Sequence, residues 1–424
     1  MARSSQRRLT HNIGVLYGLQ AVRYVTPLVL VPYLASTLGV ATWGVLSLAQ
    51  GLALYLGTLV EYSFPAMGTR MVAALREDRA RLQQVLADVT AAKGLLGTVS
   101  LALGLALALG VPEVRAAAGL FGGCAAVAVL QAAAPYWFLN GLERMRLVAG
   151  ITTVERVLGL GLILALVREP ADVWKVPAVQ AVLAAGALAA GYGIVGRAYP
   201  IRGVSWRRAA GVLRQGWPLF TSVLAVRGYA ASGVVLLGLL ATPAAAGLYA
   251  AAEKIVRAGT GLLQPVTQAV YPRLAYLVRQ ELAPGRPVMR QWLGRTVLLG
   301  LLLGGAIFLG APWIVEPVLG ADYAGAVPLL RILAGVPVLV AVSNALGLYW
   351  MLQLHMDRAF AGITIVAAVG ALALATVVIP AHGAVGMAWI ATGAEAFIAL
   401  AMYGWLRRCR HDPLALRDPI EPTR

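Results

Sequence analysis

Residues 12–38 read NIGVLYGLQAVRYVTPLVLVPYLASTL, and this stretch determines what kind of protein the chain is. It is long and apolar enough to cross a bilayer, whose hydrocarbon core of about 30 Å needs about 20 helical residues. Arg23 lies roughly 16 Å deep if the helix enters the core at Asn12, at a rise of about 1.5 Å per residue. A guanidinium at that depth costs about 2.5–3.5 kcal/mol on insertion scales. Because Pro27 and Pro32 follow and favour a bend, the stretch predicts a spanning helix beside a water-filled path.

The composition extends this interpretation to the whole chain. Hydrophobic residues make up 60% of the 424 residues and charged residues only 12%, against about 25% charged residues in soluble proteins. We predict an all-α polytopic membrane protein with about twelve transmembrane helices, in two six-helix bundles around a central cavity. The spans are expected at residues 13–38, 43–65, 84–109, 116–139, 147–167, 176–195, 218–240, 247–275, 296–315, 327–352, 359–379 and 384–406.

The basic residues predict how these spans are oriented. An even number of spans places both termini on one side, and 25 of the 35 Lys and Arg residues fall in segments on that side, against 3 in the opposite connections. The positive-inside rule then makes both termini cytoplasmic. We expect a first bundle over 1–195, a basic cytoplasmic linker over 196–217, a second bundle over 218–406 and a cytoplasmic tail over 407–424. The linker is expected to be a solvated loop or, alternatively, an amphipathic segment on anionic lipid.

An internal repeat relates the two halves. Ala21-Val22-Arg23 recurs as Ala225-Val226-Arg227, early in the first span of each half. Two halves whose spans cross the membrane in the same direction fit a pseudo-twofold axis along the membrane normal. By helical rise, Arg227 and Arg257 lie roughly 14 and 15 Å from the faces at which their spans begin. We therefore expect Arg23, Arg227 and Arg257 to converge near the midplane, and the further candidates for substrate binding are Gln20, Lys254 and Gln264.

Three carboxylates are candidates for coupling transport to an ion gradient: Glu61, Glu253 and Glu395. The alternative for Glu253 is a neutralising pair with Arg257 one turn later, and for Glu395 a buried bridge to a central arginine. Arginine suits phosphate because its planar guanidinium makes bidentate, charge-assisted hydrogen bonds. A cationic cavity in the membrane therefore predicts an anionic substrate that is moved by alternating access. No Walker-type loop is present in the sequence, which argues against ATP as the direct driver.

The sequence favours a transporter over an enzyme. Its two Cys and four His residues form no ligand-spaced cluster, so neither a metal nor a cofactor is expected. A membrane-embedded glycan polymerase or glycosyltransferase, which is the alternative from a different class, would need catalytic groups in a sizeable outer loop. The outer connections are too short for that. We expect membrane lipid as a partner and no nucleic acid.

Three segments together resemble bacterial O-antigen and polysaccharide flippases of the Wzx type. They are residues 12–64, PYWFLNGLERMR at 135–146, and GLYAAAEKIVRAGTGLLQPVTQAVYPRL at 247–274. The resemblance places the chain in the polysaccharide transporter family of the multidrug/oligosaccharidyl-lipid/polysaccharide exporter superfamily. It implies a bacterial inner-membrane protein that flips an undecaprenyl-pyrophosphate-linked oligosaccharide from the cytoplasmic to the periplasmic leaflet. It also implies a glycan polymerase and glycosyltransferases as partners.

Two rivals belong to the same superfamily. A flippase for the lipid-linked peptidoglycan precursor is expected to have two further C-terminal spans, which this sequence lacks. A multidrug antiporter would favour a cavity lined by carboxylates, because its substrates are cations, over one lined by three arginines.

Overall fold

The protein is described by a computed structural model. It describes residues 2–267, 270–271, 274, 282–409 and 411; of these, the side chains of 2–25, 225–226, 229–230 and 282–286 lie outside the description. In these parts of the chain the structure consists of helices, turns and short connections, with no strand. The predicted all-α class is therefore confirmed.

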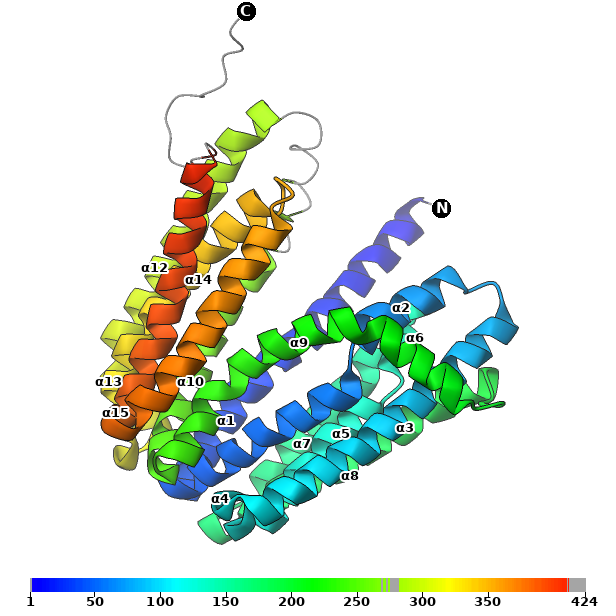
Figure 1. Ribbon diagram of the computed structural model, residues 1–424, viewed down its shortest axis with the longest axis horizontal. Coiled ribbons are helices and arrows are strands. Elements are labelled where there is room, and N and C mark those ends of the chain that lie inside the picture. The colour runs from blue at the N-terminus through cyan, green and yellow to red at the C-terminus, as the bar shows by residue number, and fades with distance from the viewer. Residues whose placement is uncertain (1, 268–269, 272–273, 275–281, 410, 412–424) are drawn as a thin grey trace, which may run out of the picture. The chain divides into compact units, whose positions relative to one another are not determined.

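Apart from the segment between Gly261 and Leu282, which is described only in part, the helices follow one another along the chain with short connections (Figure 1). Their bounds are α1 Ala2–Glu61, α2 Phe64–Ala74, α3 Arg79–Gly110, α4 Pro112–Ala116, α5 Ala118–Ala133, α6 Tyr136–Gly141, α7 Met145–Leu166, η1 Pro170–Trp174, α8 Lys175–Ala198, α9 Trp206–Leu240, α10 Pro243–Gly261, α12 Leu282–Leu319, η2 Ala321–Tyr323, α13 Ala326–Leu333, α14 Gly335–Asn344, η3 Ala345–Met351 and α15 Asp357–Arg408. The segment η3 is a π-helix.

Eight helices in the described residues are long and apolar enough to cross a membrane. Two of them each contain two predicted spans. Gly39 interrupts α1 with a φ of 71°, and Gly383 interrupts α15 with a φ of 52°, a backbone region that favours glycine. Each break falls between two predicted spans, so the predicted multi-span architecture is confirmed. The eighth predicted span, 247–275, begins on α10 and ends beyond the continuously described residues.

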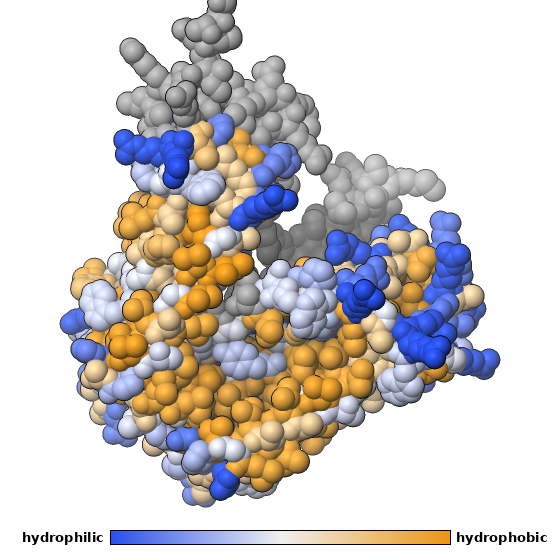
Figure 2. Space-filling view, viewed as in Figure 1, coloured by the Kyte–Doolittle hydropathy of each residue, from blue (hydrophilic) through white to orange (hydrophobic). Residues whose placement is uncertain are grey.

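The outer faces of these helices are apolar, as a membrane requires. Along α3, Leu101, Leu105 and Leu109 are each more than half exposed. In a soluble protein such a stripe would be unfavourable, whereas in lipid it is the favoured surface. Figure 2 shows apolar side chains over the middle of the first unit's helices and hydrophilic ones near α2, α6 and the start of α9.

The chain divides into two compact units, residues 1–239 and 240–424. Helix α9, which contains the predicted seventh span, therefore belongs with the first unit in this division. The division into bundles over 1–195 and 218–406 stays a prediction.

Of the two forms expected for the linker over 196–217, the solvated loop does not describe its second half, which is helical, whereas an amphipathic segment remains a prediction. Helix α8 extends to Ala198 and α9 begins at Trp206, so only 199–205 connects them. The reason is burial. Ala209 is fully buried, and Val212 and Leu213 pack against the core of the first unit, so this arginine-rich stretch has a protein-facing apolar side.

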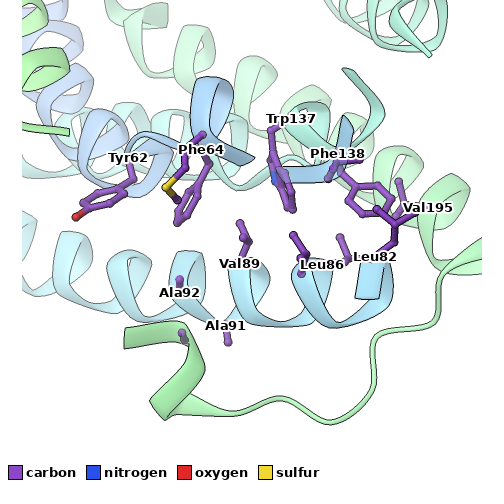
Figure 3. Packing of buried hydrophobic residues seen from close by; sticks show 14 of the residues in the cluster. Tyr62, Phe64, Leu82, Leu86, Val89, Ala91, Ala92, Trp137, Phe138 and Val195 are labelled. Atoms are coloured by element: carbon purple, nitrogen blue, oxygen red, sulfur yellow. The ribbon is translucent and has the colours of Figure 1, made fainter. Parts of the chain in front are cut away.

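That core lies between α2, α3, α6, α8 and the first half of α9 (Figure 3). Tyr62 stacks on Phe220 with ring centroids 4.4 Å apart, and the Trp137 and Phe138 rings meet edge to face at 5.5 Å. Leu82 and Leu86 of α3 complete the layer and are fully buried. The residues at the break between α1 and α2, Tyr62 and Phe64, thus pack against α3 and α9 in this core.

An ion pair between a buried carboxylate and an exposed arginine also joins α3 to α9. Both oxygens of Asp88, which is 6% exposed, accept hydrogen bonds from Arg208 Nε at 3.0 Å. We expect Asp88→Asn to lower the free energy of unfolding by about 1.5–3 kcal/mol, because it weakens a hydrogen bond between charged groups. Thermal denaturation in detergent measures this change. If Arg208→Gln and D88N had fully additive effects, the two side chains would not be coupled.

Candidate functional site

The candidate site lies at the end of α1, where the helix is broken. Glu61 is its last residue, Tyr62 has a φ of 53°, and α2 begins at Phe64 with Pro65 in its first turn. A positive φ at a non-glycine residue is strained and is maintained only by surrounding contacts. Tyr62 has such contacts, because its hydroxyl donates to the carbonyl of Leu213 at 2.8 Å and its ring stacks on Phe220. The break therefore holds the carboxylate of Glu61 in a defined place.

Glu61 forms an ion pair with Arg227, a residue 166 positions later on α9. Arg227 Nη1 donates to Glu61 Oε2, and the side chains are 38% and 29% exposed respectively. A guanidinium has five donors, and Glu61 is the acceptor found for it among the described residues. The remaining donors can bind an oxyanion. Of the arginines expected to bind substrate, Arg227 thus has a half-buried position fixed by a long-range partner.

On both sides of the Glu61–Arg227 pair, the backbone of α9 lies close to α1 or to the residues that directly follow α1. Tyr55 Oη donates to the carbonyl of Gly228 at 2.8 Å. A Cβ on Gly216 would meet Ser63 Oγ at 2.4 Å, and one on Gly51 would meet Val235 Cγ2 at 2.7 Å. These small residues allow the two helices to pack closely, as is common in membranes.

Lys93 is a second cation at this site. It is only 5% exposed on α3, and its Nζ donates to the carbonyls of Ala132 at 2.6 Å and Ala134 at 3.3 Å. Nζ also lies 5.8 Å from the centroid of the Phe64 ring. The sequence places Lys93 at the inner interface, because the unbroken apolar run starts only after it, and it does not indicate the two carbonyls that Lys93 contacts.

In the second unit, the sequence candidates on α10 form a local pair. Arg257 Nη2 donates to Glu253 Oε1 at 2.9 Å, one helical turn apart, with side-chain exposures of 53% and 19%. The alternative predicted for Glu253, a neutralising pair, is the arrangement observed. Lys254 is half-buried on the same helix, and Gln264 is exposed just beyond its end.

The remaining candidates are distributed as follows. The backbone of Gln20 and Arg23 lies in α1, and their side chains lie outside the described residues. Glu395 is half-buried on α15 and has no hydrogen-bond or ion-pair partner among the residues that the structure describes. The predicted bridge from Glu395 to a central arginine is thus not found in that part of the chain. The convergence of Arg23, Arg227 and Arg257 stays a prediction.

The first unit also has a half-open pocket of about 300 Å³ between α1, α5, α7 and α8. Its walls are mostly apolar, and Gln50, Gln180 and Arg156 supply polar groups together with Glu155 and Gln131. Gln131 Nε2 donates to Glu155 Oε1 at 3.0 Å.

Comparison with known families gives one match that covers most of the chain. The family model described as "Polysaccharide biosynthesis protein" matches residues 9–278. Two curated proteins named "Putative O-antigen transporter" are similar in sequence. The one from Escherichia coli (strain K12) is 28% identical over 86% of this chain and 89% of its own length. The one from Shigella dysenteriae is 25% identical over 92% and 98%. The resemblance inferred from the sequence is confirmed.

Two solved structures share the fold at low sequence identity. An inward-facing multidrug resistance MATE family transporter of the MOP superfamily aligns with a TM-score of 0.63 at 16% identity, over 92% of this chain and 97% of its own. The lipid II flippase MurJ, in an inward closed conformation, aligns with a TM-score of 0.61 at 12% identity, over 92% and 87%. These likenesses concern the fold alone.

Proposed function

Because this chain belongs to the family of polysaccharide biosynthesis proteins, we propose that it is a flippase for a lipid-linked glycan. Its substrate is an undecaprenyl-pyrophosphate-linked oligosaccharide, an O-antigen or related repeat unit. The protein moves it from the cytoplasmic to the periplasmic leaflet of the bacterial inner membrane by alternating access. Two relatives named for O-antigen transport, similar over nearly their full length, support this substrate class.

Arg227 is the observation that carries the proposal. A cation half-buried on a membrane helix is expensive and marks a substrate or ion pathway. Its partner Glu61 neutralises it in the absence of substrate, so the arginine is stable in the membrane and still has donors for a phosphate. A pyrophosphate carries more negative charge than a single carboxylate and can accept bidentate hydrogen bonds. Arg227 therefore binds the pyrophosphate, and Arg23 and Arg257 complete a cationic cavity with Gln20, Lys254 and Gln264.

Glu395 is the best-supported candidate for ion coupling. Glu61 and Glu253 each neutralise an arginine, whereas Glu395 has no described partner that holds it charged. A carboxylate of this kind can take up a proton or bind a small cation as the gradient changes. Both termini are cytoplasmic in this proposal, and the glycan is made by glycosyltransferases and used by a polymerase.

Reconstitution in liposomes tests the flippase directly. Fluorescent undecaprenyl-pyrophosphate oligosaccharide is incorporated, and a membrane-impermeant quencher reports how much of it remains in each leaflet. We expect the purified protein to equilibrate the leaflets and empty liposomes to leave them unequal. Transport of lipid-linked peptidoglycan precursor in preference to this substrate would favour the nearest rival.

The same liposome assay, carried out with and without an ion gradient, tests whether Glu395 couples transport to that gradient. We expect Glu395→Gln to transport at the same rate with and without a proton or sodium gradient, while the wild type is accelerated by one of them. The isosteric amide keeps the shape and removes the charge, so the comparison isolates titration or cation binding. If the wild-type transport rate were the same with and without each gradient, none of the three carboxylates would have a coupling role.

A further inference from the structure

The second unit has a half-open groove of about 680 Å³ between three helical segments. They are 290–297 of α12, 339–346 in α14 and the start of η3, and 396–403 of α15. Within each segment the lining residues follow the first one after three, four or seven positions, so each helix turns one face toward the groove. At a rise of about 1.5 Å per residue, each segment is about 10 Å long.

The beginning of α12 and the end of α15 lie at the same end of this groove. Figure 1 shows α12 beginning and α15 ending at the same end of the second unit. One hydrophobic core cluster joins them, because Met289 and Met402 are both buried in it together with Leu346 of η3. Arg290 and Tyr403 are the next residues along the two helices, and both line the groove. They therefore mark one and the same end of it.

This end of the groove is cationic, and the rest of the groove is apolar. Arg290 is half-buried and is the charged residue among the described residues that line the groove. Arg407, one turn beyond Tyr403 on the same side of α15, is exposed. Trp405 is 44% exposed beside it, and tryptophan is enriched where a membrane meets water. An anionic amphiphile has the same pattern, a charged head and an apolar chain.

The packing of α12 leaves space for such a chain. Gly294 lines the groove, and a Cβ added there would have no atom within 4 Å. Six residues later on the same helix, a Cβ on Gly300 would meet the Cβ of Ala341 at 2.7 Å. Helix α12 thus packs closely on α14 at Gly300 and leaves open space at Gly294, nearer the cationic end. An empty gap would lose dispersion contacts on one side, so an apolar chain is favoured in it.

We propose that this groove binds one anionic phospholipid, with the phosphate on Arg290 and an acyl chain along the apolar walls. Arg290 also has an interaction within the chain, and its five donors allow it to bind a phosphate beside that interaction. Basic pockets between membrane helices bind anionic lipid head groups in this way. The inference goes beyond the proposed function and does not depend on it, because no residue of the groove belongs to the proposed substrate site.

Photolabelling with a residue-level readout tests the groove. The purified full-length protein in a neutral detergent is mixed with phosphatidylglycerol that carries a photoreactive diazirine in one acyl chain, and mass spectrometry of peptides identifies the labelled residues. We expect saturable labelling of Val297, Leu339 and Leu400, which line the groove. Unlabelled phosphatidylglycerol is expected to abolish this labelling, and phosphatidylcholine at the same concentration is expected to leave most of it.

The charge of Arg290 is tested by Arg290→Gln. We expect the half-saturating lipid concentration to rise about fivefold, which is about 1 kcal/mol and the size typical of one basic residue near an anionic lipid surface. Arg295→Gln is the matched control on the same helix. Arg295 is exposed, lies 5.0 Å from the centroid of the Trp292 ring and does not line the groove. If R295Q weakened labelling as much as R290Q, surface charge in general would attract the lipid, and the proposal would be wrong.

The apolar part of the groove is tested by Gly294→Leu. The added side chain enters open space, so it fills the groove without displacing a neighbouring atom at its Cβ. We expect labelling of Leu339 and Leu400 to fall to background. Gly305→Leu is the control, because its Cβ also has no atom within 4 Å and Gly305 does not line the groove. Labelling of G294L at the wild-type level would show that the lipid lies elsewhere, and this result decides the matter even if R290Q fails to fold.

Two competition results would also overturn the proposal. If phosphatidylcholine displaced the label as well as phosphatidylglycerol does, the groove would hold any membrane lipid without selecting its charge. If undecaprenyl phosphate displaced the label at a lower concentration than phosphatidylglycerol, the groove would hold the polyprenyl chain of the proposed substrate and not a phospholipid.

Discussion

Arg227→Ala is expected to abolish glycan export while the protein remains in the membrane. The substitution removes the guanidinium that the phosphate would bind, and it also leaves Glu61 without its ion-pair partner. Removing one partner of a fully buried, hydrogen-bonded charge pair weakens binding by about 2–5 kcal/mol, and for this half-buried pair we expect an effect near the lower end, about thirtyfold. Complementation of a strain that lacks its own flippase, scored by surface glycan, measures the loss, and membrane fractionation measures the amount of protein.

Two further variants make this result interpretable. Arg227→Lys keeps the charge and loses the planar fork, so partial export is expected, whereas full export would argue against bidentate phosphate binding. Arg76→Ala is the matched control, because it also removes an arginine that pairs with a distant glutamate, Glu143 at 3.1 Å. That pair is well exposed at 56% and 68%, and such pairs contribute at most about 1 kcal/mol. Normal export in R227A would exclude Arg227 as a substrate ligand.

The helices were predictable because hydropathy and length decide them in a membrane. Lipid satisfies no backbone hydrogen bond, so each apolar run of sufficient length must be helical, and most predicted spans coincide with a described helix. Five arginines over 196–217 predict a solvated loop or an amphipathic segment, and the structure has a helix from Trp206 onward. Its apolar positions, Ala209, Val212 and Leu213, were the signal for a packed helix. The density of arginines predicts that this segment lies on the cytoplasmic side of the membrane. It does not predict whether the segment is a loop or a helix.

The candidate site was predictable only where its partners are close in sequence. The pair Glu253–Arg257 follows from a spacing of one helical turn. The pair Glu61–Arg227 joins residues 166 apart, so the sequence identified both residues and assigned them separate roles without indicating that they touch. For a similar reason the sequence does not indicate the acceptors of Lys93, because they are carbonyls at a helix break 39 and 41 residues later. Side-chain types reveal which charges need partners, and only the fold reveals which partners they have.

Gly304→Ala is expected to destabilise the second unit, although alanine is the better helix former. Gly304 lies on α12 where that helix crosses the start of α14, and a Cβ there would meet the carbonyl oxygen of Ala334 at 2.5 Å and Val338 Cγ2 at 3.1 Å. Gly300, one turn earlier, is just as confined, with the Ala341 Cβ at 2.7 Å and the Pro337 carbonyl oxygen at 2.9 Å. A backbone oxygen cannot give way as a side chain can, so the helices must separate. Overpacking of this kind costs about 1–3 kcal/mol.

Gly305→Ala is the matched control, and its effect is expected to have the opposite sign. No atom lies within 4 Å of the Cβ that it would add. The same substitution, one residue further along the same helix, therefore has only the helix-propensity term, which favours alanine by about 0.8–1 kcal/mol. Thermal denaturation in detergent is expected to place G304A below the wild type and G305A at or above it. Equal shifts in the two variants would mean that α12 and α14 do not pack through the face that carries Gly300 and Gly304, because a close helix crossing discriminates between adjacent positions that point in different directions.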